Sequence, residues 1–261
     1  MNHTQHTHTF PLLLLLVPLA IATVYAATWK FMDKQNKRNA VISIVVLQIA
    51  LAPLSQLMLQ DYPMSFHMLG HILILLIFPP LFWSATPAII LTNILSNAAA
   101  KKILTLLSFP VIAYVIGMTV MWITNIPMLF NQGTHHIHHG LHTFLFMSLP
   151  IDFGAMIVLQ LIAGLIYSLP AFVPIDSLRL MPLQRVVYLF ISCLGCTVLG
   201  IIIAFNPANM YTLANATNLS PVIDLQISGL IMWVPGCLVY ISKCIFILAD
   251  FFKDQKLAES Y

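Results

Sequence analysis

The chain has 261 residues, of which 60% are hydrophobic and only 7% are charged, and its mean hydropathy is +0.93. Soluble domains carry about 25% charged residues, so these values exclude an ordinary soluble protein and predict an all-α, polytopic membrane protein. The formal net charge of +3 says little as a total. The sequence shows no Walker or Rossmann glycine pattern, and we expect no nucleic-acid partner.

Seven apolar stretches each supply the roughly 20 apolar residues that a bilayer requires. They span residues 10–29, 40–59, 67–91, 103–124, 151–169, 183–205 and 222–249. Together they predict one transmembrane helix-bundle domain over residues 1–261. The first stretch resembles a signal peptide in length, but its basic residues follow it, so we count it as a span. Pro79 and Pro80 are expected to kink the third span or to end its regular part.

Basic residues and histidines separate completely across these seven spans. All eleven Lys and Arg residues fall on one side, which the positive-inside rule makes cytoplasmic. The N-terminus is therefore expected outside and the C-terminus in the cytoplasm. All ten histidines fall on the outer side, namely His3, His6, His8, His67, His71, His135, His136, His138, His139 and His142. Because imidazole is a common ligand of zinc, copper and iron, the outer face is expected to meet a metal.

The pair His67 and His71 is the strongest candidate for a metal site. The two residues are four apart at the entrance of the third span, so a helix places both imidazoles on one face. Polar side chains at membrane depth are costly and indicate function. The structural alternative is a pair of interfacial histidines that bond to their neighbours.

Other outer-side residues could complete the ligand set. Met68 offers a soft thioether suited to Cu(I), although Met is also a common core residue. Asp152 and Met156 form a second pair at helical spacing at the start of the fifth span. Asp224 opens the seventh span, and both aspartates could instead be helix N-terminal charges.

Two further motifs have weaker interpretations. The segment His135–His139 could capture metal or respond to pH, but it is expected to be a loop. Cys193 and Cys196 have CxxC spacing inside the sixth span, and without water or a basic partner these thiols are expected to be inert. Packing also explains Cys237 and Cys244 better than a redox role does.

Three segments together resemble the multi-spanning CtaG family of cytochrome c oxidase assembly factors. They are MSFHMLGHILILLIFPPLF, RVVYLFISCLGCTVLGIIIAF and DLQISGLIMWVPGCLVYI, and the resemblance covers most of residues 40–245. It implies that His67, His71 and Asp224 occupy the family's polar positions. It also implies a respiratory oxidase subunit or a copper chaperone as partner, and a bacterial inner membrane with the histidine-rich face toward the periplasm or exterior.

The chain departs from the family pattern at two places. Where the family shows W-x-x-H-x-P, this chain has Trp122, Asn125 and Pro127. Where the family shows H-x-x-E-H, the best-matched segment begins at Asp152 and ends at Met156. An alternative alignment takes His138 and His142 as that pair, at the cost of an overlong fifth span.

Two functions from different classes follow. The first is a copper-binding assembly factor that helps to mature a respiratory cytochrome c oxidase from the outer face, within the lipid bilayer. The alternative is a membrane enzyme that uses zinc or iron, either a hydrolase or a histidine-box oxygenase. Desaturase histidine boxes face the cytoplasm, whereas these histidines face outward, so an enzyme is the less favoured interpretation.

Overall fold

The computed structural model describes residues 9–56, 64–125, 153–207 and 220–259, and every element within these ranges is a helix. The N-terminal half contains α1 (Thr9–Thr28), η1 (Trp29–Phe31), α2 (Lys34–Gln56), α3 (Met64–Ile72), η3 (Leu73–Ile77), α4 (Phe78–Ala85), α5 (Ala88–Leu95), α6 (Ala98–Leu107) and α7 (Pro110–Ile123). The C-terminal half contains α9 (Phe153–Phe172), α10 (Pro182–Phe205) and α11 (Pro221–Glu259). The all-α prediction is confirmed for the described residues.

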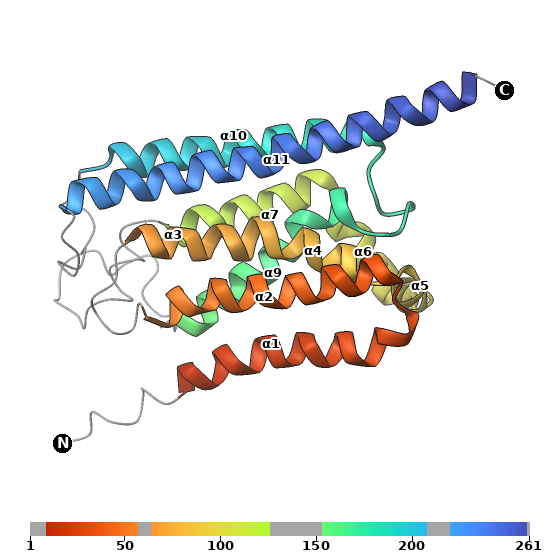
Figure 1. The fold of residues 1–261 in the computed structure, drawn as a ribbon, viewed down its shortest axis with the longest axis horizontal. Helices are drawn as coiled ribbons and strands as arrows, with labels where there is room; N and C mark the ends of the chain where they lie inside the picture. The colour runs from red at the N-terminus through yellow and green to blue at the C-terminus, as the bar shows by residue number, and fades with distance from the viewer. Residues whose placement is uncertain (1–8, 57–63, 126–152, 208–219, 260–261) are drawn as a thin grey trace.

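The long helices run along one common direction and form an elongated bundle (Figure 1). α10 and α11 lie side by side and form one edge, while α1 forms the opposite edge. The short helices α5 and α6 lie at one end of the bundle, near the turn between α1 and α2. α3 begins at the other end, so the predicted metal site and the short helices lie at opposite ends.

Three helical segments are long and apolar enough to cross a membrane, namely Met64–Ala85, Pro182–Phe205 and Pro221–Lys253. The pair α5 and α6 adds a fourth if it is counted as one span, and it is bent by 117°. Leu16–Phe31, Pro110–Ile123 and Met156–Phe172 are shorter apolar helices. The described residues thus support a membrane protein with three or four spans by length and composition, and the seven-span count stays a prediction.

The third and fourth predicted spans have different bounds in the structure. The third was expected to reach residue 91, but α4 ends at Ala85 because Thr86 and Pro87 adopt extended backbone conformations. Residues 88–107 then form the two short helices, and Asn97 caps α6 by accepting from the backbone N–H groups of Ala99 and Ala100. The fourth helix accordingly begins at Pro110 and not at residue 103.

The third span is interrupted just before its two prolines. Regular α-helix ends at Ile72, η3 has π-helical geometry, and Phe78 N–H bonds back to the carbonyl of Leu73. Pro79 and Pro80 then stand in the first turn of α4, where their missing N–H groups cost least. The sequence left open whether the prolines kink the third span or end its regular part; the α-helix is interrupted by a π turn before Pro79 and resumes through both prolines.

Helix α9 packs closely against this interruption. A Cβ added at Gly164 would lie 3.0 Å from Pro79 Cγ and 3.2 Å from the carbonyl oxygen of Ile74. A little further along, Trp83 Nε1 donates to the carbonyl of Leu165 and to Ser168 Oγ, each at 3.0 Å. These contacts tie the third span to α9 on both sides of the prolines.

Helices α10 and α11 approach each other through glycines. A Cβ at Gly229 would lie only 2.4 Å from the carbonyl oxygen of Gly200, and one at Gly200 would lie 2.8 Å from the carbonyl oxygen of Gly229. In a membrane, where water does not drive helices together, such close backbone contact is a main source of helix association. The same logic holds for α7 and α9, where a Cβ at Gly117 would lie 2.5 Å from the ring of Tyr167.

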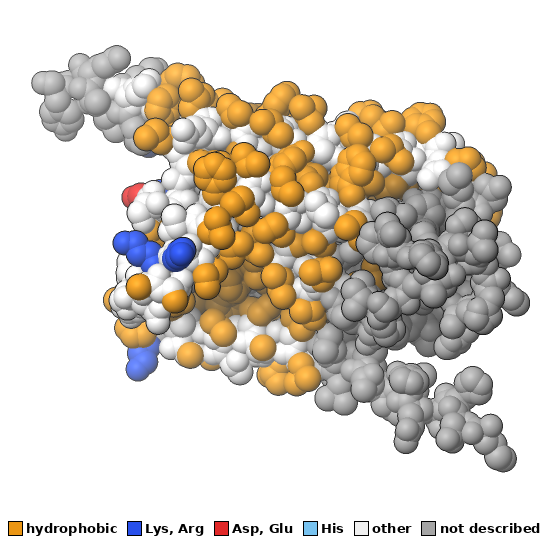
Figure 2. Space-filling view, turned by 180° about the vertical axis from the view of Figure 1, so that it is seen from behind, with side chains coloured by type: hydrophobic (Ala, Val, Ile, Leu, Met, Phe, Trp, Pro, Cys, Tyr) orange, Lys and Arg blue, Asp and Glu red, His pale blue; other side chains and the backbone are white. Residues whose placement is uncertain are grey.

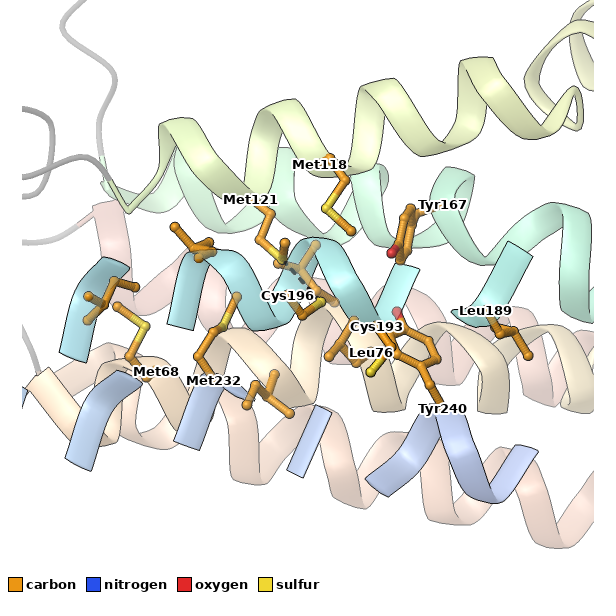
Figure 3. Close-up of a cluster of buried hydrophobic side chains, with 14 of the residues drawn as sticks. Met68, Leu76, Met118, Met121, Tyr167, Leu189, Cys193, Cys196, Met232 and Tyr240 are labelled. Atoms are coloured by element: carbon orange, nitrogen blue, oxygen red, sulfur yellow. Dashed lines mark hydrogen bonds between the residues drawn. The ribbon is translucent and has the colours of Figure 1, made fainter. Parts of the chain in front are cut away.

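The surface and the core divide as expected for a protein in lipid. Figure 2 shows hydrophobic side chains over the middle of one face and Lys and Arg side chains gathered at one end of it. The largest core cluster joins α3, α7, α9, α10 and α11 and is rich in Met, Cys and Tyr (Figure 3).

Candidate metal centre

His67 and His71 lie on one face of α3 and meet at their ring nitrogens. The two Nε2 atoms are 2.6 Å apart, and the rings stand nearly perpendicular at a centroid distance of 4.1 Å. Both side chains are buried, at 3% and 1% exposure. Two lone pairs would repel each other at this distance, so one Nε2 carries a proton and donates it to the other in a hydrogen bond. The helical spacing therefore produces the expected juxtaposition of two imidazoles.

Gln160 on α9 is a third polar side chain at this position, and the sequence analysis did not single it out. It is 2% exposed, and its Nε2 lies 3.4 Å from His71 Nε2. Gln160 Oε1 and His71 Nδ1 are both buried and have no hydrogen-bond partner within the described residues. The available signal was a lone amide within an otherwise apolar helix, which membrane depth makes costly.

Asp224 connects the first turn of α11 to the start of the histidine helix. Its Oδ2 accepts from the backbone N–H of Met64 at 2.7 Å, and its Oδ1 accepts from that of Ser65 at 3.2 Å. The N–H groups at a helix start lack partners within the helix, and the helix dipole favours an anion there. Asp224 therefore caps α3, a helix 160 residues away in sequence, and holds it by a buried, charge-assisted contact.

The two methionine candidates lie in different surroundings. Met68 is fully buried and belongs to the large core cluster, together with Met64. Met156 is half-buried on α9, one helical turn before Gln160 and hence on the same face of that helix. Asn125, at the end of α7, is buried, and its Nδ2 donates to the carbonyl of Met121 at 2.6 Å.

Three of the predicted ligands, Asp152, His138 and His142, lie outside the described residues, as do the other histidines of the 135–139 segment and of the N-terminus. Within the described ranges, no three His, Cys, Asp or Glu side chains converge closely enough to hold a metal ion. The described part of the centre thus consists of two facing imidazoles, with a buried amide beside them and a carboxylate that fixes their helix.

The histidine pair lies toward the end of the bundle that is opposite the basic residues. α3 begins at the end opposite η1, α5 and α6 (Figure 1). Lys30, Lys101 and Lys102 belong to those three elements or their loops. Chemically, neutral imidazoles in an apolar surround are suited to bind a soft or borderline cation and poorly suited to bind an anion.

Comparison with known proteins identifies the family. Residues 40–254 match the model of the cytochrome c oxidase caa3 assembly factor family, Caa3_CtaG. No curated protein and no solved structure shows significant similarity to the chain. The matched region contains both histidines, Gln160, Asp224 and all the helices from α3 to α10. Because it covers well over half of the sequence, the chain belongs to the CtaG family of cytochrome c oxidase caa3 assembly factors.

Proposed function

We propose that this chain supports assembly of a cytochrome c oxidase by binding copper at His67 and His71 and delivering it from the outer face of the membrane. Its family associates it with oxidase assembly. The observation that carries the copper proposal is the approach of the two buried Nε2 atoms to 2.6 Å. Copper is the cargo of this process, and a copper chaperone or an oxidase subunit is its donor or acceptor.

The donor set fits Cu(I) better than it fits zinc. Zinc favours imidazole, carboxylate and thiolate ligands, whereas the methionines proposed for this set supply soft thioethers. Cu(I) accepts few ligands and tolerates thioether and imidazole donors. Met156, Asp152 and either His138 or His142 are the residues that we propose to complete the set, with Met68 as a further thioether. An incomplete set suits delivery, because a weakly held ion can pass on to its acceptor.

The surrounding residues position the pair. Asp224 fixes the start of α3, which sets the depth of both imidazoles. Gln160 presents its amide to His71 Nε2 from α9. Gln160 is therefore an outer-shell polar group beside the ligand nitrogen, and such groups tune metal affinity.

The direction of delivery follows from charge. Lys and Arg side chains gather at one end of the bundle (Figure 2), and the histidine helix begins at the other. By the positive-inside rule, the histidine end faces the exterior, which is the periplasm for a bacterial inner membrane. With seven crossings, the N-terminus lies outside and the C-terminus lies in the cytoplasm.

The test compares metal content in three proteins purified in mild detergent under reducing conditions: native, His67→Ala/His71→Ala, and His135→Ala/His136→Ala as the matched control. We expect Cu(I) bound by the native and control proteins and lost from the first double variant. Oxidase assembly, measured as the copper content and activity of the oxidase in cells that depend on this factor, should fall in parallel. Zinc or iron bound natively in place of copper, or copper retained without His67 and His71, would contradict the proposal.

A further inference from the structure

Helix α6 has a charged side and an apolar side on its exposed surface. None of its residues is buried. Ile103 and Leu106 are each 57% exposed, and Lys101 and Lys102 are exposed as well. Because each helical residue turns the chain by about 100°, both lysines share one side of the helix with Thr105. Ile103 and Leu106 lie together on a neighbouring side, so α6 has the pattern of an amphipathic helix.

The segment formed by α5 and α6 is too short and too bent to cross a membrane. α5 has 8 residues and α6 has 10, so they are about 12 Å and 15 Å long, whereas the hydrocarbon core is about 30 Å thick. The two helices are bent against each other by 117°. α4 ends and α7 begins at the same end of the bundle (Figure 1). The chain between them therefore returns to the side that it left.

The same end of the bundle carries residues that are typical of a membrane surface. Trp29, in the turn between α1 and α2, is 42% exposed, and Lys37 Nζ lies 5.3 Å from the centroid of its ring. This turn lies near α5 and α6 (Figure 1). Exposed tryptophan and lysine side chains anchor membrane proteins at the boundary between lipid and water. A boundary at the level of Trp29 passes close to α6.

We infer that α6 lies in the plane of the membrane surface and binds anionic phospholipid. Lys101 and Lys102 contact the phosphate groups, while Ile103 and Leu106 enter the first part of the acyl chains. Adjacent basic residues beside a membrane favour anionic over zwitterionic headgroups. With the orientation proposed above, this lipid belongs to the cytoplasmic leaflet. The inference is independent of the copper proposal, which concerns the opposite end of the bundle.

The positive charge on α6 has no counterpart nearby in the described chain. Residues 86–109 contain no Asp or Glu, and neither Lys101 nor Lys102 forms an ion pair with another described residue. In the loop after α9, Asp176 is already paired with Arg179. An anionic partner from outside the chain therefore meets two unpaired ammonium groups.

A phospholipid suits this surface better than a second copy of the chain does. One lipid molecule combines a negative headgroup with acyl chains, so it covers the charged side and the apolar side of α6 together. A two-fold contact between copies would bring the same surface against itself. The lysines of both copies would then repel each other.

The first experiment places the full-length protein in nanodiscs of phosphatidylcholine, with or without phosphatidylglycerol, and measures hydrogen exchange of the α6 backbone. We expect phosphatidylglycerol to slow this exchange several-fold in the native protein and to have no such effect in Lys101→Gln/Lys102→Gln. The matched control is Lys243→Gln/Lys253→Gln, which removes the same charge from two exposed positions of α11 and should respond as the native protein does. All four substitutions are at exposed side chains, so the fold should persist in both variants.

The second experiment tests the position of the segment. Ser96 lies between α5 and α6 and is exposed. In membrane vesicles, Ser96→Cys should react with a membrane-impermeant maleimide from the same side as Lys30→Cys, with the unsubstituted protein as background.

Three results would overturn the inference. The first is a Ser96→Cys thiol that reacts from neither side or from the side opposite Lys30→Cys, since the segment would then enter or cross the bilayer. The second is slowed exchange that is equal in the two lipid mixtures or that persists in Lys101→Gln/Lys102→Gln. The third is slowed exchange that follows protein density and not lipid charge, which would assign the surface to a second copy of the chain.

Discussion

The carboxylate of Asp224 accepts a hydrogen bond from the backbone N–H of Met64 at 2.7 Å, so the start of α11 caps the start of α3. The helix that carries both histidines is therefore fixed by a side chain from the far end of the sequence. The sequence grouped Asp224 with His67 and His71 as possible ligands of one site, but the structure gives Asp224 a different role. His67 and His71 face each other, while Asp224 positions the helix on which they stand.

Replacing this cap should destabilise the protein. Asp224→Ala leaves two buried backbone N–H groups without an acceptor, which we expect to lower the free energy of unfolding by about 1–3 kcal/mol. Asp224→Asn retains one carbonyl oxygen and should lose less. Thermal unfolding in detergent measures the effect, with Asp250→Ala on the exposed side of the same helix as control. Equal melting temperatures for native and Asp224→Ala would refute the capping role.

Gln160 should tune the metal affinity without holding the fold. Gln160→Leu substitutes an apolar side chain of similar size for the amide beside His71, and loss of a polar group next to the ligands lowers metal affinity roughly 10–100-fold. Competition with a Cu(I) chelator gives the affinity, and thermal unfolding shows whether the fold is intact. Gln226→Leu, which alters an exposed amide on α11, is the control. A folded Gln160→Leu protein with native affinity would show that the amide has no part in binding.

The glycine contact between α10 and α11 should tolerate no side chain at Gly229. In Gly229→Val the new Cβ would fall 2.4 Å from the carbonyl of Gly200, and overpacking of this kind costs about 1–3 kcal/mol or more. Gly236→Ala on the same helix is a milder comparison, because its Cβ would lie 3.3 Å from a flexible leucine methyl group. The circular dichroism signal of the helices, followed during heating, would rank the stability of the two variants. A Gly229→Val protein as stable as Gly236→Ala would contradict the close contact between Gly229 and Gly200.

Trp83 should anchor the second half of the third span to α9. Trp83→Phe removes a donor that bonds both Leu165 and Ser168, and we expect a loss of about 1 kcal/mol, the usual value for such a bond between membrane helices. Trp122 is 37% exposed, so Trp122→Phe serves as a matched change on the surface. Denaturation of the two variants side by side tests this assignment, which fails if they lose the same stability.

Local patterns predicted much of this molecule. Apolar length alone indicated α10 and α11, and the spacing of His67 and His71 predicted their shared face, because helical geometry is local. Hydropathy assigned residues 88–91 to the third span and residues 103–107 to the fourth, because both segments are apolar and continue the neighbouring spans without a break. Thr86 and Pro87 contained the missing signal, because the residue before a proline avoids helical conformation.

The rest of the centre depended on contacts between distant segments. Nothing near Asp224 in the sequence identifies Met64 as its partner. The importance of Gln160 likewise depends on how α9 packs against the third span. Of the predicted ligands, Asp152, His138 and His142 lie outside the described residues, and their roles stay predictions.

The π turn at Leu73–Ile77 gives the third span two different sets of neighbours. A π turn accommodates one residue more than an α-helical turn, which rotates everything after it by about 100° around the helix axis. Before it, α3 packs against α11 and α2; after it, α4 packs against α2 and α9, so the partner that changes is α11 for α9. Removing one residue here would restore a regular helix, but then either the histidines or Trp83 would turn away from its partner. The interruption thus lets one span carry the histidine pair on the side that its first half requires and still direct Trp83 toward α9 in its second half.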